Sequence, residues 1–84
     1  MKYTVTYSAF ADRQLTDIWI EAPDRKAVSD ASSDIDRVLG QRASQIGTPN
    51  QDGWRGLVAP PLAITFKVSE EDRLVTVLSV RYRP

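Results

Sequence analysis

Strand-type and helical hydrophobic patterns follow one another in three segments of this chain of 84 residues, in an order that restricts the folds it can adopt. Residues 1–7 alternate between apolar and polar side chains, which predicts a half-buried strand at residues 2–7. Helical spacing occupies residues 10–39, and strand-type sequence returns over residues 54–82. One strand, two helices and a final group of strands predict a single α+β domain over residues 1–84, with the helices packed on one face of an antiparallel sheet.

The helical region predicts an antiparallel hairpin of two helices, near residues 9–22 and 24–39. Ser8 is a suitable N-cap, because its hydroxyl can accept a hydrogen bond from a backbone N–H that the helix leaves unpaired. Pro23 disfavours a continuing helix and suits the first turn of a new one. The apolar residues of the first helix share one face and are all expected in the core: Ala11, Leu15, Ile18, Trp19 and Ala22.

A polar loop at residues 41–53 leads into three further strands, expected at residues 54–58, 62–69 and 73–82 as an antiparallel meander. Four of their apolar side chains are expected to be largely buried: Ile64, Phe66, Val77 and Leu78. The last strand is apolar on both faces, which indicates a central strand or one whose second face is covered by a partner.

Composition excludes several classes of functional site. The chain has no cysteine and no histidine, which excludes disulfides, thiolate metal sites and histidine general bases. Asp34 and Asp36 lie two residues apart on a predicted helix and therefore do not face each other. The acidic run at residues 70–72 is typical of a solvated turn. We therefore expect no metal and no cofactor.

Charge and hydropathy restrict the partners and the compartment. Eleven basic residues balance eleven acidic ones, so a polyanion would have to be bound by a local patch. No stretch approaches the roughly 20 apolar residues of a membrane span, and the N-terminus lacks the apolar block of a secretory signal. We therefore expect a cytoplasmic protein.

Several segments, taken in order, resemble the RelE/ParE superfamily of toxins from type II toxin–antitoxin systems. The resemblance covers nearly the whole chain, and its markers are Tyr3–Ser8, Ala11–Trp19, Arg55–Leu57, Leu62–Val68 and Val75–Arg83. It implies a fold in which the helices pack on one face of an antiparallel sheet. It also implies a toxin that is held inactive by a cognate antitoxin protein wrapped over it.

The same resemblance implies two activities, which differ in the residues they need. RelE-type toxins cut messenger RNA in the ribosomal A site with a set of Lys, Arg and Tyr side chains, whereas ParE-type toxins lack that set and inhibit DNA gyrase by binding. Ala63 stands where the RelE-type enzymes carry an arginine, and residues 56–61 lack their lysines. Those enzymes also continue past the last strand to a catalytic Tyr or His, whereas this chain stops at Pro84. Only Arg83 and Tyr82 lie near a catalytic position of the family.

The departures favour a ParE-like, non-enzymatic toxin with DNA gyrase as its target. One alternative is a RelE-like, ribosome-dependent mRNA endoribonuclease that relies on Arg83 and Tyr82; another is an inactive relic or adaptor with the toxin fold. Cleavage by 2′-OH attack needs cations to stabilise charge on the phosphorane and a group that moves protons. One arginine supplies only part of the first requirement.

Five residues are candidates for binding an antitoxin or nucleic acid: Trp54, Arg55, Arg81, Tyr82 and Arg83. The Arg-Tyr-Arg string combines ion pairing with stacking, and its alternative interpretation is a solvated tail. Trp54 is either an interface anchor or a buried structural residue. Lys67 and Arg73 are two further candidate cations, for which we favour a structural role in protecting strand edges from unwanted pairing.

Overall fold

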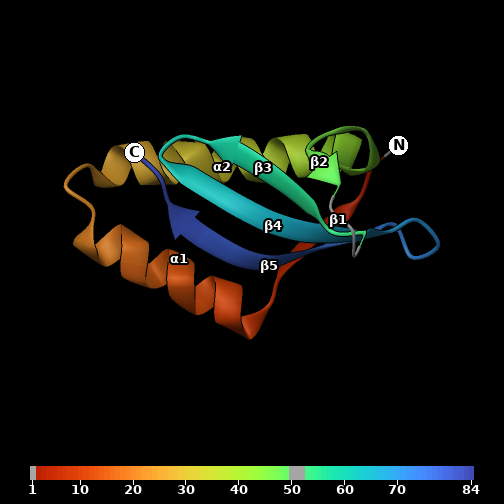
Figure 1. The fold of residues 1–84 in the computed structure, drawn as a ribbon, viewed down its shortest axis with the longest axis horizontal. Coiled ribbons are helices and arrows are strands. Elements are labelled where there is room, and N and C mark those ends of the chain that lie inside the picture. The colour runs from red at the N-terminus through yellow and green to blue at the C-terminus, as the bar shows by residue number, and fades with distance from the viewer. Residues whose placement is uncertain (1, 50–52) are drawn as a thin grey trace.

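The elements follow one another in the predicted order. The structure is a computed structural model that describes residues 2–49 and 53–84. Its elements are β1 (Thr4–Tyr7), α1 (Ala9–Glu21), α2 (Arg25–Arg42), the 3-10 turn η1 (Ala43–Gln45), β2 (Thr48–Pro49), β3 (Arg55–Ala59), β4 (Leu62–Ser69) and β5 (Leu74–Tyr82). In Figure 1, α2 lies behind the sheet and α1 lies along its β5 edge. The expected α+β fold is confirmed.

The sheet is mixed and not wholly antiparallel. Its strand order is β1-β5-β4-β3-β2, and the meander β3-β4-β5 is antiparallel as predicted. β1, however, pairs in parallel with β5, so that Thr4 lies opposite Leu74 and Tyr7 lies opposite Val77. The expectation of an antiparallel sheet was wrong at this strand, because the long connection through two helices is the kind that joins parallel strands. The short strand β2, in the region expected as a loop, pairs with the start of β3.

Both helices begin at side-chain caps. Ser8 Oγ accepts a hydrogen bond from the backbone N–H of Ala11 at 3.0 Å, and Asp24 Oδ1 accepts one from the backbone N–H of Ala27 at 3.1 Å. The predicted corner at Pro23 therefore lies between the two helices. Within the described ranges, neither helix combines the length and the apolar character needed to cross a membrane.

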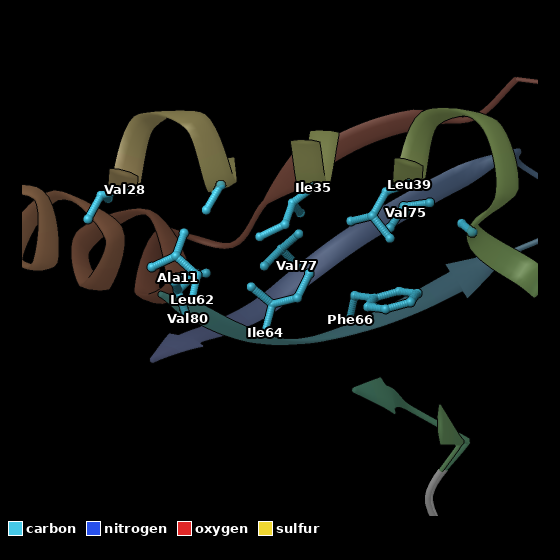
Figure 2. Close-up of a cluster of buried hydrophobic side chains, with 12 residues drawn as sticks. Ala11, Val28, Ile35, Leu39, Leu62, Ile64, Phe66, Val75, Val77 and Val80 are labelled. Atoms are coloured by element: carbon cyan, nitrogen blue, oxygen red, sulfur yellow. The ribbon is translucent and has the colours of Figure 1, made fainter. Parts of the chain in front are cut away.

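Apolar side chains between the helices and the sheet form the core (Figure 2). Its buried members are Ala11, Val28, Ala31, Ile35, Leu39, Ala43, Leu62, Ile64, Phe66, Val75, Val77 and Val80. Ile64, Phe66 and Val77 are therefore buried as predicted. Both helices contribute to this one cluster, which confirms that they cover the same face of the sheet.

Leu78 is only half-buried, contrary to expectation. The register between β4 and β5 shifts at Thr65 and Phe66: Phe66 lies opposite Val77, and Thr65 lies opposite Ser79. Leu78 is the extra residue of this bulge and has no partner in the register. A bulge changes which residues point inward, and the alternation of apolar residues does not reveal it.

Trp19 is 43% exposed, so its assignment to the core was wrong. It follows Ile18 by one residue and is therefore turned about 100° further round the helix axis. The indole N–H donates a hydrogen bond to Ser29 Oγ at 3.1 Å, and the Arg25 guanidinium lies 5.0 Å from the ring centre. Because a serine of α2 faces it, the ring is held at the surface instead of being enclosed.

Candidate partner-binding surface

One face of the sheet is not covered by the helices, and we call this the open face (Figure 1). Since side chains alternate along a strand, the open face carries the neighbours of the inward-pointing residues of β3, β4 and β5. Its described members include Gly56, Val58, Ala63, Thr65, Lys67, Leu74, Thr76, Ser79 and Arg81. Val58 is 55% exposed, and both Lys67 and Arg81 are exposed. This surface combines apolar and basic groups.

The Arg-Tyr-Arg string is divided between the two faces of the sheet. Arg81 lies opposite Ala63, on the open face, whereas Tyr82 lies opposite Leu62 and points to the helix side. Arg83 follows the strand, and its backbone N–H donates a hydrogen bond to the carbonyl of Pro61 at 2.6 Å. The backbone of the string is therefore paired as far as Arg83, so Arg81 and Arg83 lie on one side of it and Tyr82 lies on the other.

Trp54 and Arg55 lie at the other end of the sheet from Arg81. Arg55 lies opposite Phe66 at the start of β3. The other end of β3, at Ala59, lies on the side of the sheet where Tyr82 ends β5, about 13 Å further along the strand. Arg55 is half-buried, and its Nη1 donates a hydrogen bond to the carbonyl of Ile46 at 3.2 Å. Trp54 is 43% exposed. The structure does not bring the five candidate residues together.

Lys67 is a cation of the open face for which the sequence favoured only a structural role. It was expected at a strand edge, but β4 lies between β3 and β5, so that expectation was wrong. Lys67 lies opposite Thr76, four positions along β4 from Ala63 and its partner Arg81. The spacing corresponds to about 13 Å. The two cations therefore extend along the face and do not converge on one phosphate.

Arg73 belongs to a polar cluster at the hairpin end, and its assignment to edge protection was also wrong. Its Nη1 lies 3.0 Å from Glu70 Oε2, and its guanidinium lies 4.4 Å from the centre of the Tyr3 ring. The Tyr3 hydroxyl donates a hydrogen bond to Glu70 Oε1 at 2.7 Å and lies 2.9 Å from Ser44 Oγ. The bond from Tyr3 is the main reason that the pKa of Glu70 is lowered, with Ser44 and Arg73 acting in the same direction against desolvation. These contacts tie β1 to the turn between β4 and β5.

The acidic groups of the two regions considered for a metal have other partners. Asp34 pairs with Arg37 at 3.3 Å, and Asp36 Oδ1 accepts a hydrogen bond from the Tyr7 hydroxyl at 2.8 Å. Burial and this bond to Asp36 raise the pKa of Tyr7 far above its ordinary value, so the hydroxyl stays protonated and remains a donor. No group of three potential acidic ligands converges within residues 2–49 and 53–84.

Comparison with known proteins identifies the fold. No protein-family model and no curated protein matches the sequence. Among solved structures, a chain of the toxin–antitoxin complex RelBE2 from Mycobacterium tuberculosis superposes with a TM-score of 0.82 at 17% identity, covering 99% of this chain and 93% of that one. A chain of the chromosomal ParDE system of Pseudomonas aeruginosa gives 0.76 at 21% identity, covering 99% and 98%. The RelE–RelB complex from Pyrococcus horikoshii gives 0.73 at 11% identity, covering 99% and 97%.

The chain therefore has the RelE/ParE toxin fold over its whole length, as the sequence predicted. Both RelE and ParE complexes occur among the similar structures, so the fold does not separate the two subtypes.

Proposed function

We propose that this chain is the toxin of a type II toxin–antitoxin module and that a cognate antitoxin protein neutralises it. The proposal is supported by the fold, which matches chains from three toxin–antitoxin complexes over nearly their full length. It is also supported by the open face, where the exposed side chain of Val58 and the half-buried side chain of Leu74 lie on a sheet that the helices do not cover. An apolar surface of this kind favours a partner.

We further propose that the toxin acts by binding, as a ParE-like inhibitor of DNA gyrase, and not as a ribonuclease. The observation that carries this proposal is the separation of Arg81 from Lys67 along the open face. The register partner of Arg81 is Ala63, and Lys67 lies about 13 Å away along the face. Arg83 follows Arg81 by two residues and, with its backbone paired to Pro61, returns to the same side at the edge of the strand. A phosphorane needs cations that converge on it and a group that moves protons. The described open-face positions of β3, β4 and β5 carry neither a carboxylate nor a tyrosine, and the one carboxylate beside them, that of Asp72 in the turn, lines a hollow with Lys67 and Leu74, far from Arg81.

Expression of the chain without an antitoxin tests the target. We expect a DNA-damage response before protein synthesis falls, and we expect purified gyrase to lose supercoiling activity when the protein is added. The measurements are a damage-response reporter, incorporation of labelled methionine and a plasmid supercoiling assay. Rapid arrest of translation without a damage response would favour the RelE-like endoribonuclease instead. Unimpaired growth would favour an inactive relic.

The antitoxin is expected to contact the basic end of β5. Replacing Arg81 and Arg83 together with alanine should weaken antitoxin binding and change the free energy of unfolding by less than about 1 kcal/mol, because both side chains are exposed. The antitoxin can be taken from a neighbouring small reading frame, and binding can be measured by titration calorimetry beside thermal unfolding. A matched control replaces Lys26 and Arg37 with alanine, which removes the same charge from exposed positions on α2. Unchanged affinity in the β5 variant would show that these arginines are only solvated.

A further inference from the structure

Helix α1 carries a second uncovered surface, on the side that faces away from the core. The exposed residues on and beside the line through Ala9 and Thr16 are Ala9, Asp12, Arg13, Thr16, Trp19 and Ile20, whereas Phe10 and Asp17, which are also exposed, lie further round the helix. Ala9 and Thr16 are seven residues apart and therefore lie on one line along the helix. Asp12 and Trp19 flank this line on the side of α2, and Arg13 and Ile20 flank it on the other side. Figure 1 shows α1 at the periphery of the molecule.

Trp19, the aromatic residue of this surface, lies beside a hollow. A cavity of about 320 Å³ opens between α1 and α2, lined by Leu15, Thr16, Trp19, Ser29 and Ser32. The ring of Trp19 is already oriented by its hydrogen bond to Ser29. Ile20 is 53% exposed on the adjacent flank. An exposed side chain that is held in place loses little conformational freedom when it is buried in an interface, which favours its use as an anchor.

The polar residues of this surface are arranged for self-recognition. Asp12 and Arg13 are adjacent in sequence, carry opposite charges and take part in no ion pair within the described residues. The hydroxyl of Thr16 donates a hydrogen bond to the carbonyl of Asp12 at 3.0 Å. Thr16 therefore brings no unsatisfied donor into a contact along the line that it shares with Ala9.

We infer that α1 is a self-association surface, on which a second copy of this chain packs its own α1 in parallel about a two-fold axis. Rotation about such an axis places Thr16 beside Thr16 of the second copy. Each flank of one helix then faces the opposite flank of the other helix. Arg13 then meets Asp12 of the second copy, and the same ion pair forms twice. Ile20 meets Trp19 of the second copy and enters the hollow beside it.

The charge pattern selects the parallel arrangement. An antiparallel pair centred on Thr16 would place Asp12 against Trp19 and Arg13 against Ile20 of the second copy, which would desolvate both charges without a counter-ion. The parallel pair satisfies both charges and joins the apolar groups. Because the open face of the sheet lies on the other side of the core, this contact leaves that face free. The inference is therefore independent of the proposed toxin function.

Charge reversal tests the inference on the full chain. We expect sedimentation velocity to show a monomer–dimer equilibrium for the unmodified protein and loss of the dimer in Arg13→Asp, where two carboxylates would face each other. The double variant Asp12→Arg/Arg13→Asp should restore the dimer, because the same pair re-forms in reverse. Ile20→Asp should also abolish it. Asp17→Arg, on the same helix but off this surface, is the matched control and should dimerise normally. Circular dichroism shows that each variant is folded.

Cysteine cross-linking tests the orientation, and the chain has no native cysteine to interfere. Ala9→Cys and Thr16→Cys should both form disulfide-linked dimers under mild oxidation, whereas Asp17→Cys should not. An antiparallel pair centred on Thr16 would cross-link Thr16→Cys but not Ala9→Cys, which would overturn the parallel arrangement. An unmodified protein that is monomeric at all soluble concentrations, or a double variant that fails to dimerise, would overturn the self-association surface itself.

Discussion

Replacing Phe66 with alanine is expected to lower the free energy of unfolding by about 3–5 kcal/mol. The side chain is 0% exposed and lies in the middle of β4, pointing into the core beneath α2 (Figure 2). Its removal leaves a cavity that the paired strands on either side cannot close without breaking their register. A domain of this length has about 4–13 kcal/mol of stability, at about 0.05–0.15 kcal/mol per residue. The substitution should therefore remove a large share of the total.

Urea unfolding followed by far-UV circular dichroism measures this loss. The control is Val58→Ala on the neighbouring strand, where the side chain is 55% exposed on the open face and the expected change is within about 0.5 kcal/mol. A loss below about 1 kcal/mol for Phe66→Ala would mean that the inward face of β4 has been assigned incorrectly.

Replacing Gly47 with alanine is expected to cost about 2–5 kcal/mol, although the residue lies outside the core cluster. Its φ of +80° is in the left-handed region, where a side chain costs about 1–2 kcal/mol. A Cβ at this position would also lie 2.6 Å from the backbone oxygen of Gly56 and 3.4 Å from the ring of Phe66. Gly56 belongs to β3, which is paired with β4, so separating these atoms should cost about 1–3 kcal/mol more.

Gly53 provides the matched control for Gly47, because its φ of +83° is almost the same. In the described structure no atom lies within 4 Å of the position that a Cβ on Gly53 would occupy. Gly53→Ala should therefore cost only the conformational term of about 1–2 kcal/mol. Equal losses for the two variants in the same urea experiment would contradict the close approach between Gly47 and β3.

The sequence predicted the elements well because their signals are local. Ser8 caps the first helix through a residue three positions away, and Pro23 separates two helices by its own backbone geometry. The alternation along β4 correctly placed Ile64 and Phe66 in the core. The direction of β1 could not be predicted from a local signal. Alternation identifies the buried face of a strand, but it does not give the orientation of that strand relative to another strand about 70 residues later.

The candidate site was predicted less well, because a site depends on register. Arg81, Tyr82 and Arg83 are consecutive in the sequence, but the pleat sends Arg81 and Tyr82 to opposite faces. Arg55 resembles a surface cation in the sequence, yet its guanidinium binds the carbonyl of Ile46. Lys67 also lies on the open face with Arg81, although it is 14 residues away in the chain and was assigned to an edge.

The sequence by itself determined the order of strands and helices, the caps, most of the core and the resemblance to the RelE/ParE toxins. Only the tertiary structure decided the parallel pairing of β1 with β5, the bulge at Leu78, the exposure of Trp19 and the distance between Lys67 and Arg81. The physical reason is the range of the interactions. Periodicity and capping act within a few residues, whereas strand direction, register and exposure depend on what distant segments present to each position once they pack.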